Sequence, residues 1–343
     1  MNGIQEVNGS IPSVSTKRLE HRFKAFFFFC FKGVIKINII GIDIGGTKCA
    51  VVLGNDSGEI IKKEKFPTED CEATIAKIIE LAEKMGKCDA IGISCGGPLD
   101  SKKGIIKSPP NLPGWDNIEI VDILKKRFDV PVFLKNDADA CGLAEWKFGA
   151  GRGTQNMIFL TFGTGLGAGL ILNGKLYSGA CDMAGEVGHI RLSDFGPVGY
   201  GKAGSFEGFC SGGGIAQLGH TVAKENSQMG HPVGFSDEIT AKTIADAANN
   251  GDESAIEVYR QCASMLGRGL SVLIDILNPE RIILGSIFQR SENLLREEMQ
   301  KVIEKETLAA SRNACEIVAA ELGEALGDVA ALCVAVCGMK GEF

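Results

Sequence analysis

The chain has 343 residues, too many for one ordinary hydrophobic core and enough for two domains of about 150 residues each. A formal net charge of -7, without a stripe of Lys and Arg, argues against a nucleic-acid partner and favours a small-molecule substrate. Glycine is abundant, at 45 residues, and gathers in short turns, which is typical of places where the backbone approaches a ligand closely.

The cysteines and the start of the chain bear on its location. None of the twelve cysteines forms a Cys-x-x-Cys pair, and several lie in apolar runs, so we expect free thiols and a cytoplasmic protein. The aromatic run at 25–31 is far shorter than the ~20 residues of a membrane span and lacks a cleavage site after it, so no membrane partner is expected. We hypothesise that residues 1–33 are a disordered or non-native extension, that Val34 is the true first residue, and that deleting the extension leaves activity intact.

Three strands joined by tight turns are predicted after Val34, and the same plan recurs about 120 residues later. Glycine turns, Gly45-Gly46 and Gly163-Thr164-Gly165, follow the first strand of each set. A repeated three-strand meander indicates a duplicated architecture. The predicted strands are 37–44, 49–53 and 59–66, then 157–162, 166–172 and 175–177.

Helical and strand-like segments follow each meander, so the expected fold class is α/β, with two lobes around a central cleft. The last helix is apolar enough on one face to pack back onto the first lobe. We expect a smaller N-terminal lobe from 34–150 plus 325–343, and a larger C-terminal lobe from 151–324. The other predicted helices are 73–85, 118–128, 255–277 and 328–337, and the other strands are 90–94, 132–134 and 281–284.

The second glycine turn nearly matches two nucleotide motifs. Gly163-x-Gly165-x-x-Ala168 satisfies the dinucleotide fingerprint, but that fingerprint opens a helix, whereas a strand is predicted at 170–172. The run from Gly169 to Lys175 resembles a phosphate loop, but Leu176 stands where a Ser or Thr would bind magnesium. Neither motif therefore explains the turn.

The remaining interpretation is a pair of turns that grip a triphosphate from opposite sides. Their glycines let backbone N–H groups point at phosphate oxygens, and Thr47 and Thr164 add hydroxyl donors. The alternative is two simple hairpin turns, for which Gly is the usual residue. The repetition, and Asp43 two residues before Gly45, favour the phosphate interpretation.

In combination, the motifs of this chain resemble those of the ROK family of bacterial sugar kinases, within the actin-like ATPase superfamily, over about residues 38–340. The resemblance implies an actin-like ATPase (ribonuclease H-like) fold and ATP with Mg²⁺ as cofactors. It also implies phosphorylation of a hexose or N-acetylhexosamine at the 6-hydroxyl, and a homodimer. The motifs are Gly41-Ile-Asp-Ile-Gly-Gly-Thr-Lys48, Gly96-Gly-Pro-Leu-Asp100, Asn111-Leu-Pro-Gly-Trp115, Asn136-Asp-Ala-Asp-Ala140, Thr161-Phe-Gly-Thr-Gly-Leu-Gly-Ala-Gly169 and Ala184-Gly-Glu-Val-Gly-His189.

Asp137 is the candidate catalytic base. It follows a predicted strand at the edge where α/β sheets bind ligands, although position alone is equally consistent with a helix N-cap. The resemblance favours the base, gives Asn136 a sugar hydroxyl, and places Asp43 beside Mg²⁺ through water. Lys48 is left outside the site, because its strand position also suits an exposed side chain.

Glu186 and His189 are expected on a loop that faces the sugar, since the surrounding glycines make a helix and a helical metal pair unlikely in this stretch. In the resembling family this His also binds a structural zinc with three cysteines. Here the corresponding positions hold Val198, Tyr200 and Ser205, so we predict no structural zinc and give the His a sugar role only. Apolar packing is expected to compensate.

The complete expected site has three parts, and one of them departs from the family. Ser286 follows Gly285 where the family has paired glycines against the adenine, which leaves nucleotide affinity open. The nucleotide and metal residues are Asp43, Gly45, Gly46, Thr47, Thr164, Gly165 and Gly285; the sugar residues are Gly97, Asn111, Asn136, Glu186, His189 and Glu207; the catalytic residue is Asp137.

Two alternatives stay open beside the kinase. One is a sugar-responsive regulator of the same family, which would need a winged-helix domain before the first strand, where no helix-turn-helix pattern or basic surface is found. The other is a sugar-binding protein that has lost catalysis. The intact Asn136, Asp137 and Glu186 argue against that loss.

Overall fold

The computed structural model describes residues 37–235 and 238–343, and residues 38–343 group into one compact unit. The hypothesis about residues 1–33 lies outside the described residues. In the described part of the chain, no helix is long and apolar enough to cross a membrane.

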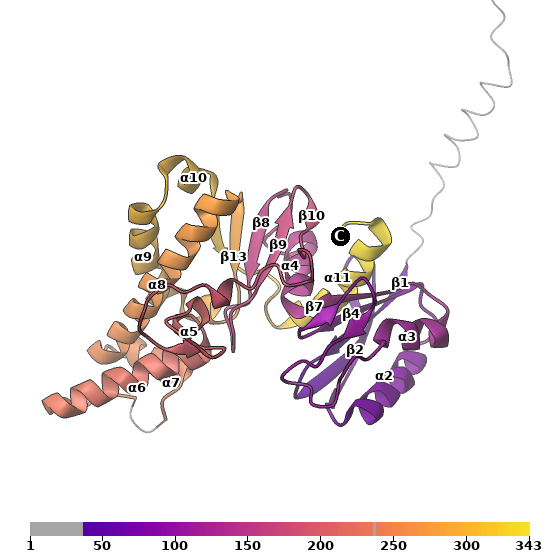
Figure 1. Ribbon diagram of the computed structural model, residues 1–343, viewed down its shortest axis with the longest axis horizontal. Helices are drawn as coiled ribbons and strands as arrows, with labels where there is room; N and C mark the ends of the chain where they lie inside the picture. Colours follow the sequence, from indigo (N-terminus) through magenta and orange to yellow (C-terminus); the bar gives the residue numbers. More distant parts are fainter. Residues whose placement is uncertain (1–36, 236–237) are drawn as a thin grey trace, which may run out of the picture. The chain divides into compact units, whose positions relative to one another are not determined.

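The first sheet has five strands in the order β3-β2-β1-β4-β7 (Figure 1). The first three form an antiparallel meander, and β4 and β7 run parallel to β1. Asp43, Ser94 and Lys135 are in register across the three parallel strands, so the carboxyl ends of these strands lie at one edge. The strands are β1 (Asn38–Ile44), β2 (Lys48–Asn55), β3 (Ile60–Pro67), β4 (Ala90–Cys95) and β7 (Val132–Asn136).

The two faces of this sheet are covered differently. Buried Ile, Leu and Val side chains on one face pack against α2 (Cys71–Met85) and α3 (Ile120–Phe128). The other face is covered by α11 (Leu326–Lys340), which approaches β4 so closely that a β-carbon on Gly92 would overlap the carbonyl oxygen of Ala331. Only a residue without a side chain allows this contact.

The prediction that the last helix packs onto the first half of the chain is confirmed, but the expectation of a single apolar face is wrong. Residues 328–337 of α11 are all buried, because the helix also packs against α4 (Asp137–Phe148). A helix enclosed on all sides carries apolar residues all round rather than along one stripe. The buried cluster that contains α11 therefore includes residues of the second sheet, and partly buried Ile60 and Phe133 of the first sheet pack against it.

The second sheet repeats the plan of the first, with the order β10-β9-β8-β13-β14. Again three antiparallel strands are followed by two strands parallel to the first of them. The predicted α/β class and the duplicated meander are confirmed. The strands are β8 (Met157–Leu160), β9 (Ala168–Leu172), β10 (Lys175–Leu176), β13 (Arg281–Leu284) and β14 (Glu316–Ala319).

The strands around the second glycine turn are shorter than predicted. Residues 161–167 leave the ladder and form a loop, which the Thr161 N–H closes by donating to the Gly167 oxygen at 3.0 Å. Six helices, two short 3-10 helices and two small hairpins complete the described chain. They are α5 (Phe206–Phe209), α6 (Gly212–Met229), α7 (Ala241–Asn249), α8 (Glu253–Leu277), α9 (Ile287–Glu306) and α10 (Ala309–Ala314), η1 (Val187–His189) and η2 (Gly323–Ala325), and the pairs β5 (Leu99–Asp100) with β6 (Ile105–Ile106) and β11 (Val198–Gly199) with β12 (Lys202–Ala203).

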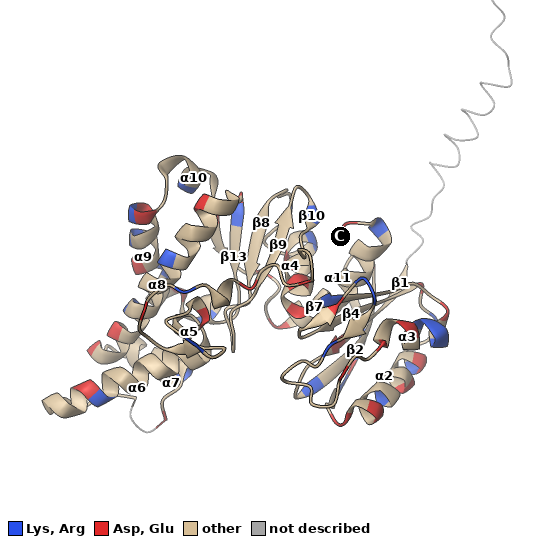
Figure 2. Ribbon diagram, in the orientation of Figure 1, with Lys and Arg blue, Asp and Glu red and all other residues tan. Residues whose placement is uncertain are grey.

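Charges of both signs are mixed along the outer helices (Figure 2). On α2, Lys84 pairs with Glu80, and on α9, Arg296 pairs with Glu292, each four residues apart. Such exposed pairs add little to stability, because water and salt screen them. Lys and Arg are thus interspersed with Asp and Glu along these helices.

Candidate active site

The first glycine turn joins β1 to β2 and brings two predicted site segments together. The N–H of Gly45 donates to the oxygen of Lys48 at 3.2 Å, and the Thr68 hydroxyl donates to the Gly45 oxygen at 2.6 Å. Gly46 lies against Asn111, where a β-carbon would stand 2.5 Å from the Asn111 oxygen. Thr47 is exposed, so its hydroxyl is open to a ligand.

A backbone hydrogen bond links the second glycine turn to the start of a helix, and the end of a neighbouring strand lies nearby. The Gly163 N–H donates to the Gly165 oxygen at 3.0 Å, and the N–H of Gly212, the first residue of α6, donates to the Gly163 oxygen at 2.8 Å. Thr164 is exposed at the tip. Gly285 lies at the end of the neighbouring strand β13, and its N–H donates to the Leu160 oxygen.

Glu207 reaches this second turn from α5. Its Oε2 accepts from the Leu166 N–H at 3.0 Å, and a β-carbon on Gly165 would lie 2.9 Å from the same oxygen. The sequence predicts a sugar-binding role for Glu207. The structure adds that one of its two oxygens is bound to the backbone of the turn, so its position and that of the turn are linked.

Asn136 and Asp137 stand at the junction of β7 and α4. Asn136 is the N-cap of α4, and its side-chain oxygen accepts from the N–H groups of Ala138 at 2.8 Å and Asp139 at 3.4 Å. The alternative in which Asp137 is a plain N-cap is therefore wrong: Asp137 is the first residue of the helix. The carboxylate stands at the positive end of the helix dipole.

The environment of Asp137 suits a proton acceptor. Part of its side chain is open to solvent, but the surrounding protein is dense enough that burial raises its pKa, while hydrogen bonds from the Ala138 and Asp137 N–H groups oppose this. Ala138 donates to Oδ1 at 2.8 Å, which leaves Oδ2 to accept a proton. A raised pKa brings a carboxylate closer to the range in which a general base works best.

Two acidic residues, Asp43 and Glu186, interact electrostatically with Asp137. Burial, followed by the charges of Asp137 and Asp328, raises the pKa of Asp43 to about 6, against the effects of Ser94 and Lys65. Burial, followed by the charges of Asp137 and Glu207, raises the pKa of Glu186, against the effect of His189. Asp137 is thus within electrostatic reach of both the predicted metal residue and the predicted sugar residue.

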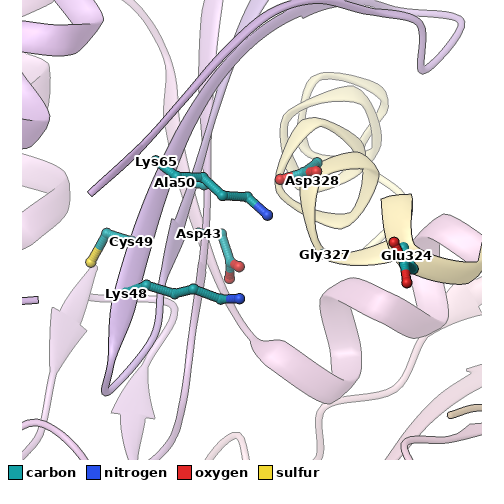
Figure 3. A pocket seen from close by; sticks show the side chains of 8 residues that line it. All are labelled: Asp43, Lys48, Cys49, Ala50, Lys65, Glu324, Gly327 and Asp328. Atoms are coloured by element: carbon teal, nitrogen blue, oxygen red, sulfur yellow. The ribbon is translucent and has the colours of Figure 1, made fainter. Parts of the chain in front are cut away.

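A cavity of about 170 Å³ opens beside Asp43, between strands β1 to β3 and the start of α11 (Figure 3). Lys48 on β2 and Lys65 on β3 extend their ammonium groups toward it. On the other side, Asp328 of α11 pairs with Lys63. The lining residues are Asp43, Lys48, Cys49, Ala50, Lys65, Glu324, Gly327 and Asp328.

Most of these residues were not predicted from the sequence, although Lys65 and Asp328 each left a signal there. Lys63 and Lys65 are two residues apart on β3 and therefore share one face of the strand. The adjacent Lys62 makes the stretch read as a general basic run, so this shared face is not evident from the sequence. Asp328 is the single acid in the otherwise apolar stretch 326–337. Lys48, which the sequence leaves outside the site, lines the cavity beside Asp43.

The Glu186–His189 segment forms the short helix η1 with exposed Glu186 and His189 side chains. The Lys202 ammonium donates to the His189 backbone oxygen at 2.7 Å, and the Tyr200 ring stands edge to face with the imidazole, 6.3 Å between centroids. The expectation of a loop that presents both side chains is consistent with this arrangement.

The residues beside His189 do not fit a zinc ion. Ser205 caps α5, since its hydroxyl accepts from the Gly208 N–H at 3.0 Å, and Val198 exchanges two 2.9 Å backbone hydrogen bonds with the Gln217 side chain. No group of three or more His, Cys, Asp or Glu in a metal-binding arrangement occurs among the described residues. The expected apolar compensation is only partly right, because Phe206 is buried while Tyr200 and Val198 are exposed.

Comparison with known proteins places these features in a family. The model of the ROK family matches residues 39–336. The chain is 33% identical over 301 residues to a glucokinase of Thermotoga maritima, covering 85% of this chain and 95% of that enzyme. It is 29% identical over 294 residues to the DNA-binding transcriptional dual regulator NagC of Escherichia coli, covering 82% of this chain and 71% of the regulator.

Solved structures agree with the sequence relatives. A ROK family glucokinase from Streptomyces griseus, in complex with glucose and AMPPNP, superposes with a TM-score of 0.70 at 31% identity, over 87% of this chain and 99% of that one. A ROK hexokinase from Thermus thermophilus superposes with a TM-score of 0.73 at 28% identity, over 89% and 100%. The fold is that of the ROK sugar kinases, and the chain belongs to the ROK family.

Proposed function

We propose that this protein is an ATP-dependent sugar kinase of the glucokinase type, which phosphorylates a hexose or N-acetylhexosamine at its 6-hydroxyl. The observation that carries the proposal is that Asp137 lies within electrostatic reach of both Asp43 and Glu186. The glucokinase relatives and the glucose complex of the Streptomyces griseus enzyme support it. We further propose a cytoplasmic homodimer with no nucleic-acid or membrane partner.

The acceptor would be activated by Asp137. The sugar hydroxyl oxygen forms a bond to the γ-phosphorus, ADP leaves, and the hydroxyl proton passes to the carboxylate of Asp137. Asn136 contributes by capping α4 with its side-chain oxygen, which leaves its Nδ2 amide free of the cap. Gly97 lies beside that amide, since a β-carbon on Gly97 would stand only 3.2 Å from Asn136 Nδ2. We propose that Gly97 and Asn136 together form a surface that contacts a sugar hydroxyl.

Besides Asn136 and Gly97, four more residues would hold the sugar: Glu186, His189, Glu207 and Asn111. Glu186 and His189 are exposed on η1, and Glu207 is bonded to the second glycine turn, so sugar and nucleotide contacts are mechanically linked there. Asn111 provides the corresponding link to the first turn through its contact with Gly46. Closure of such a site around both ligands excludes water from the transfer.

The nucleotide would lie between the two glycine turns, with phosphate oxygens facing the N–H groups of Gly46 and Gly165 and the hydroxyls of Thr47 and Thr164, while the Gly45 N–H closes the first turn. The adenine side is assigned to Gly285. Magnesium, when bound, would supply positive charge that neutralises the phosphates during transfer. Asp43 is an oxygen donor of the kind Mg²⁺ prefers, and its position on the cavity wall fits a contact through water.

Lys65 and Lys48 extend this nucleotide site. Both ammonium groups face the cavity that Asp43 lines, and Lys65 opposes the rise in the pKa of Asp43. We assign Lys65 to the terminal phosphate, while Lys63 on the same face of β3 pairs with Asp328 of α11. A structural zinc is not part of the proposal, because the positions near His189 are occupied by groups already bonded within the protein.

A coupled assay of ADP release with a panel of aldohexoses and N-acetylhexosamines tests the proposal and identifies the sugar. Turnover that requires one of these sugars and Mg-ATP is the expected result. Sugar binding without ADP release would instead support the alternatives, a regulator or a catalytically inactive sugar-binding protein.

A further inference from the structure

Lys135 is a buried lysine that the proposed phosphoryl transfer does not use. It immediately precedes Asn136 and Asp137 in β7, and only 5% of it is exposed. Its Nζ lies 3.3 Å from the hydroxyl of Ser101, 3.3 Å from the hydroxyl of Ser178, and 4.3 Å from the ring centroid of Phe343. Burying an ammonium is costly unless opposite charge compensates it.

The compensation comes through the two hydroxyls. Ser178 donates to Asp139 Oδ2 at 2.9 Å, and Ser101 donates to Asp182 Oδ1 at 2.6 Å. Each branch therefore runs in one direction, from the ammonium to a hydroxyl and from that hydroxyl to a carboxylate. Hydrogen bonds aligned in this way polarise one another, so the loss of one member weakens the rest.

The network joins three segments that are far apart in the sequence. Asp139 lies in the first turn of α4, and Ser101 directly follows β5. Ser178 and Asp182 both belong to the loop of residues 177–186 between β10 and η1, which we call the sugar loop because it ends at Glu186. The Ser101 N–H adds a second bond to Asp182, at 2.8 Å.

We propose that Lys135 is a positioning residue: through Ser101 and Ser178 it holds the sugar loop against the end of β7 and so sets the distance between Glu186 and Asp137. This inference rests on the proposed sugar-kinase function. Lys135 is two residues before the proposed base, and the second loop anchor, Asp182, is four residues before the proposed sugar ligand. A shift of the loop would therefore move Glu186 relative to Asp137.

The electrostatics of the cluster agree with this geometry. Burial raises the pKa of Asp139 to about 7, against the Ser178 hydrogen bond and the Lys135 charge, while Asp182 and Asp137 add to the rise. Burial lowers the pKa of Lys135. The charges of Asp139 and Asp182 oppose this effect, and the charge of Lys102 adds to it. Each charge thus depends on the other for its stability inside the protein.

Steady-state kinetics of the full-length Lys135→Met variant test the proposal. We expect the sugar KM to rise by about tenfold, which corresponds to about 1.4 kcal/mol. The KM for Mg-ATP should stay within about twofold, because the network holds the sugar loop and not the glycine turns. A matched control is Lys147→Met. Lys147 also contacts an aromatic ring, Trp146 at 3.5 Å, and also binds the C-terminal segment, at Glu342, but it is not linked to the sugar loop.

Milder variants keep the test decisive if Lys135→Met does not fold. Ser178→Ala and Asp182→Asn each remove one anchor, and we expect smaller increases in sugar KM that do not add in the double variant. A lower melting temperature with an unchanged sugar KM would overturn the proposal, as would equal increases in both KM values. If the wild-type protein binds but does not phosphorylate sugars, the kinase function fails, and calorimetry of glucose binding then reads the same differences as Kd. A wild-type protein that binds no sugar of the panel would overturn both proposals.

Discussion

Asn136 and Asp137 share one backbone amide: the N–H of Ala138 lies 2.8 Å from the side-chain oxygen of each. One residue is the helix cap and the other is the first residue of the helix, so the cap fixes the direction of the carboxylate. Replacing Asp137 by Asn preserves shape and hydrogen bonding but removes proton acceptance. We expect kcat to fall by roughly 10² to 10⁴-fold, with sugar affinity by calorimetry nearly unchanged.

The control for this variant is Asp129→Asn. Asp129 is the C-cap of α3 in a left-handed conformation that Asn also adopts readily, and it is remote from the site in the fold. The control should retain wild-type kcat. Wild-type turnover in Asp137→Asn would remove Asp137 from the mechanism.

The pH dependence of kcat follows from the raised pKa of Asp137. A protonated carboxyl cannot accept the sugar proton, and because burial raises this pKa, activity should decline on the acid side at a pH above the ordinary Asp value of about 3.8. The decline should be fitted in kcat at saturating sugar and Mg-ATP. A flat kcat profile down to pH 4 would contradict the assignment.

The free energy of unfolding should fall with rising pH because of Asp139, whereas a salt-bridged acid would make it rise. Its pKa is about 7 in the folded protein and near 3.8 when unfolded, so folding favours the protonated form and the associated stability is lost as pH rises from about 4 to about 7. Asp139→Asn removes this dependence. Urea unfolding at pH 5 and pH 8 should show a smaller loss of unfolding free energy in the variant than in the wild type.

Lys65 should act on the nucleotide alone. Lys65→Met removes a cation that faces the cavity beside Asp43, and we expect the KM for Mg-ATP to rise several-fold with little change in the sugar KM. Lys62→Met is the matched control, since Lys62 lies on the same strand, three residues away, and pairs with Glu64 outside the cavity. Equal behaviour of the two variants would argue against a phosphate role.

The contact between Gly46 and Asn111 predicts that a single methyl group disturbs two parts of the site. In Gly46→Ala the new β-carbon would stand 2.5 Å from the Asn111 oxygen, so the turn or the Asn111 segment must shift, and kcat/KM for both substrates should fall. Gly213→Ala is the control, because Gly213 is exposed at the start of α6 with no atom within 4 Å of a β-carbon. That control should keep full activity.

Metal removal tests the zinc prediction. After treatment with a chelator and readdition of Mg²⁺ alone, we expect full activity and an unchanged melting temperature, because Ser205 and Gln217 hold the segment beside His189 by hydrogen bonds. Metal analysis should find no tightly held zinc. One zinc ion per chain, with activity lost on its removal, would show that another ligand set holds it.

The sequence alone was sufficient for the meander, its repetition and the class of fold. Alternating β-branched strands and glycine turns are local signals, so β13 was placed at its observed bounds and the candidate turns were found. The stretch 161–167 was harder, because its apolar residues fit a strand while its backbone bonds close a loop. A local sequence pattern does not show whether strand pairing or the bonds that close a loop will form.

Tertiary structure alone decided which distant residues meet. The sequence points to Asp137 as an acid at a strand end, but only the fold brings it within reach of Asp43 and Glu186. For Asp43 the reason is the parallel register of β1, β4 and β7, which aligns their carboxyl ends. Likewise, Lys135 and Asp182 have no local signal that joins them. Their link arises because a buried ammonium must find its opposite charge through whichever segments the fold packs around it.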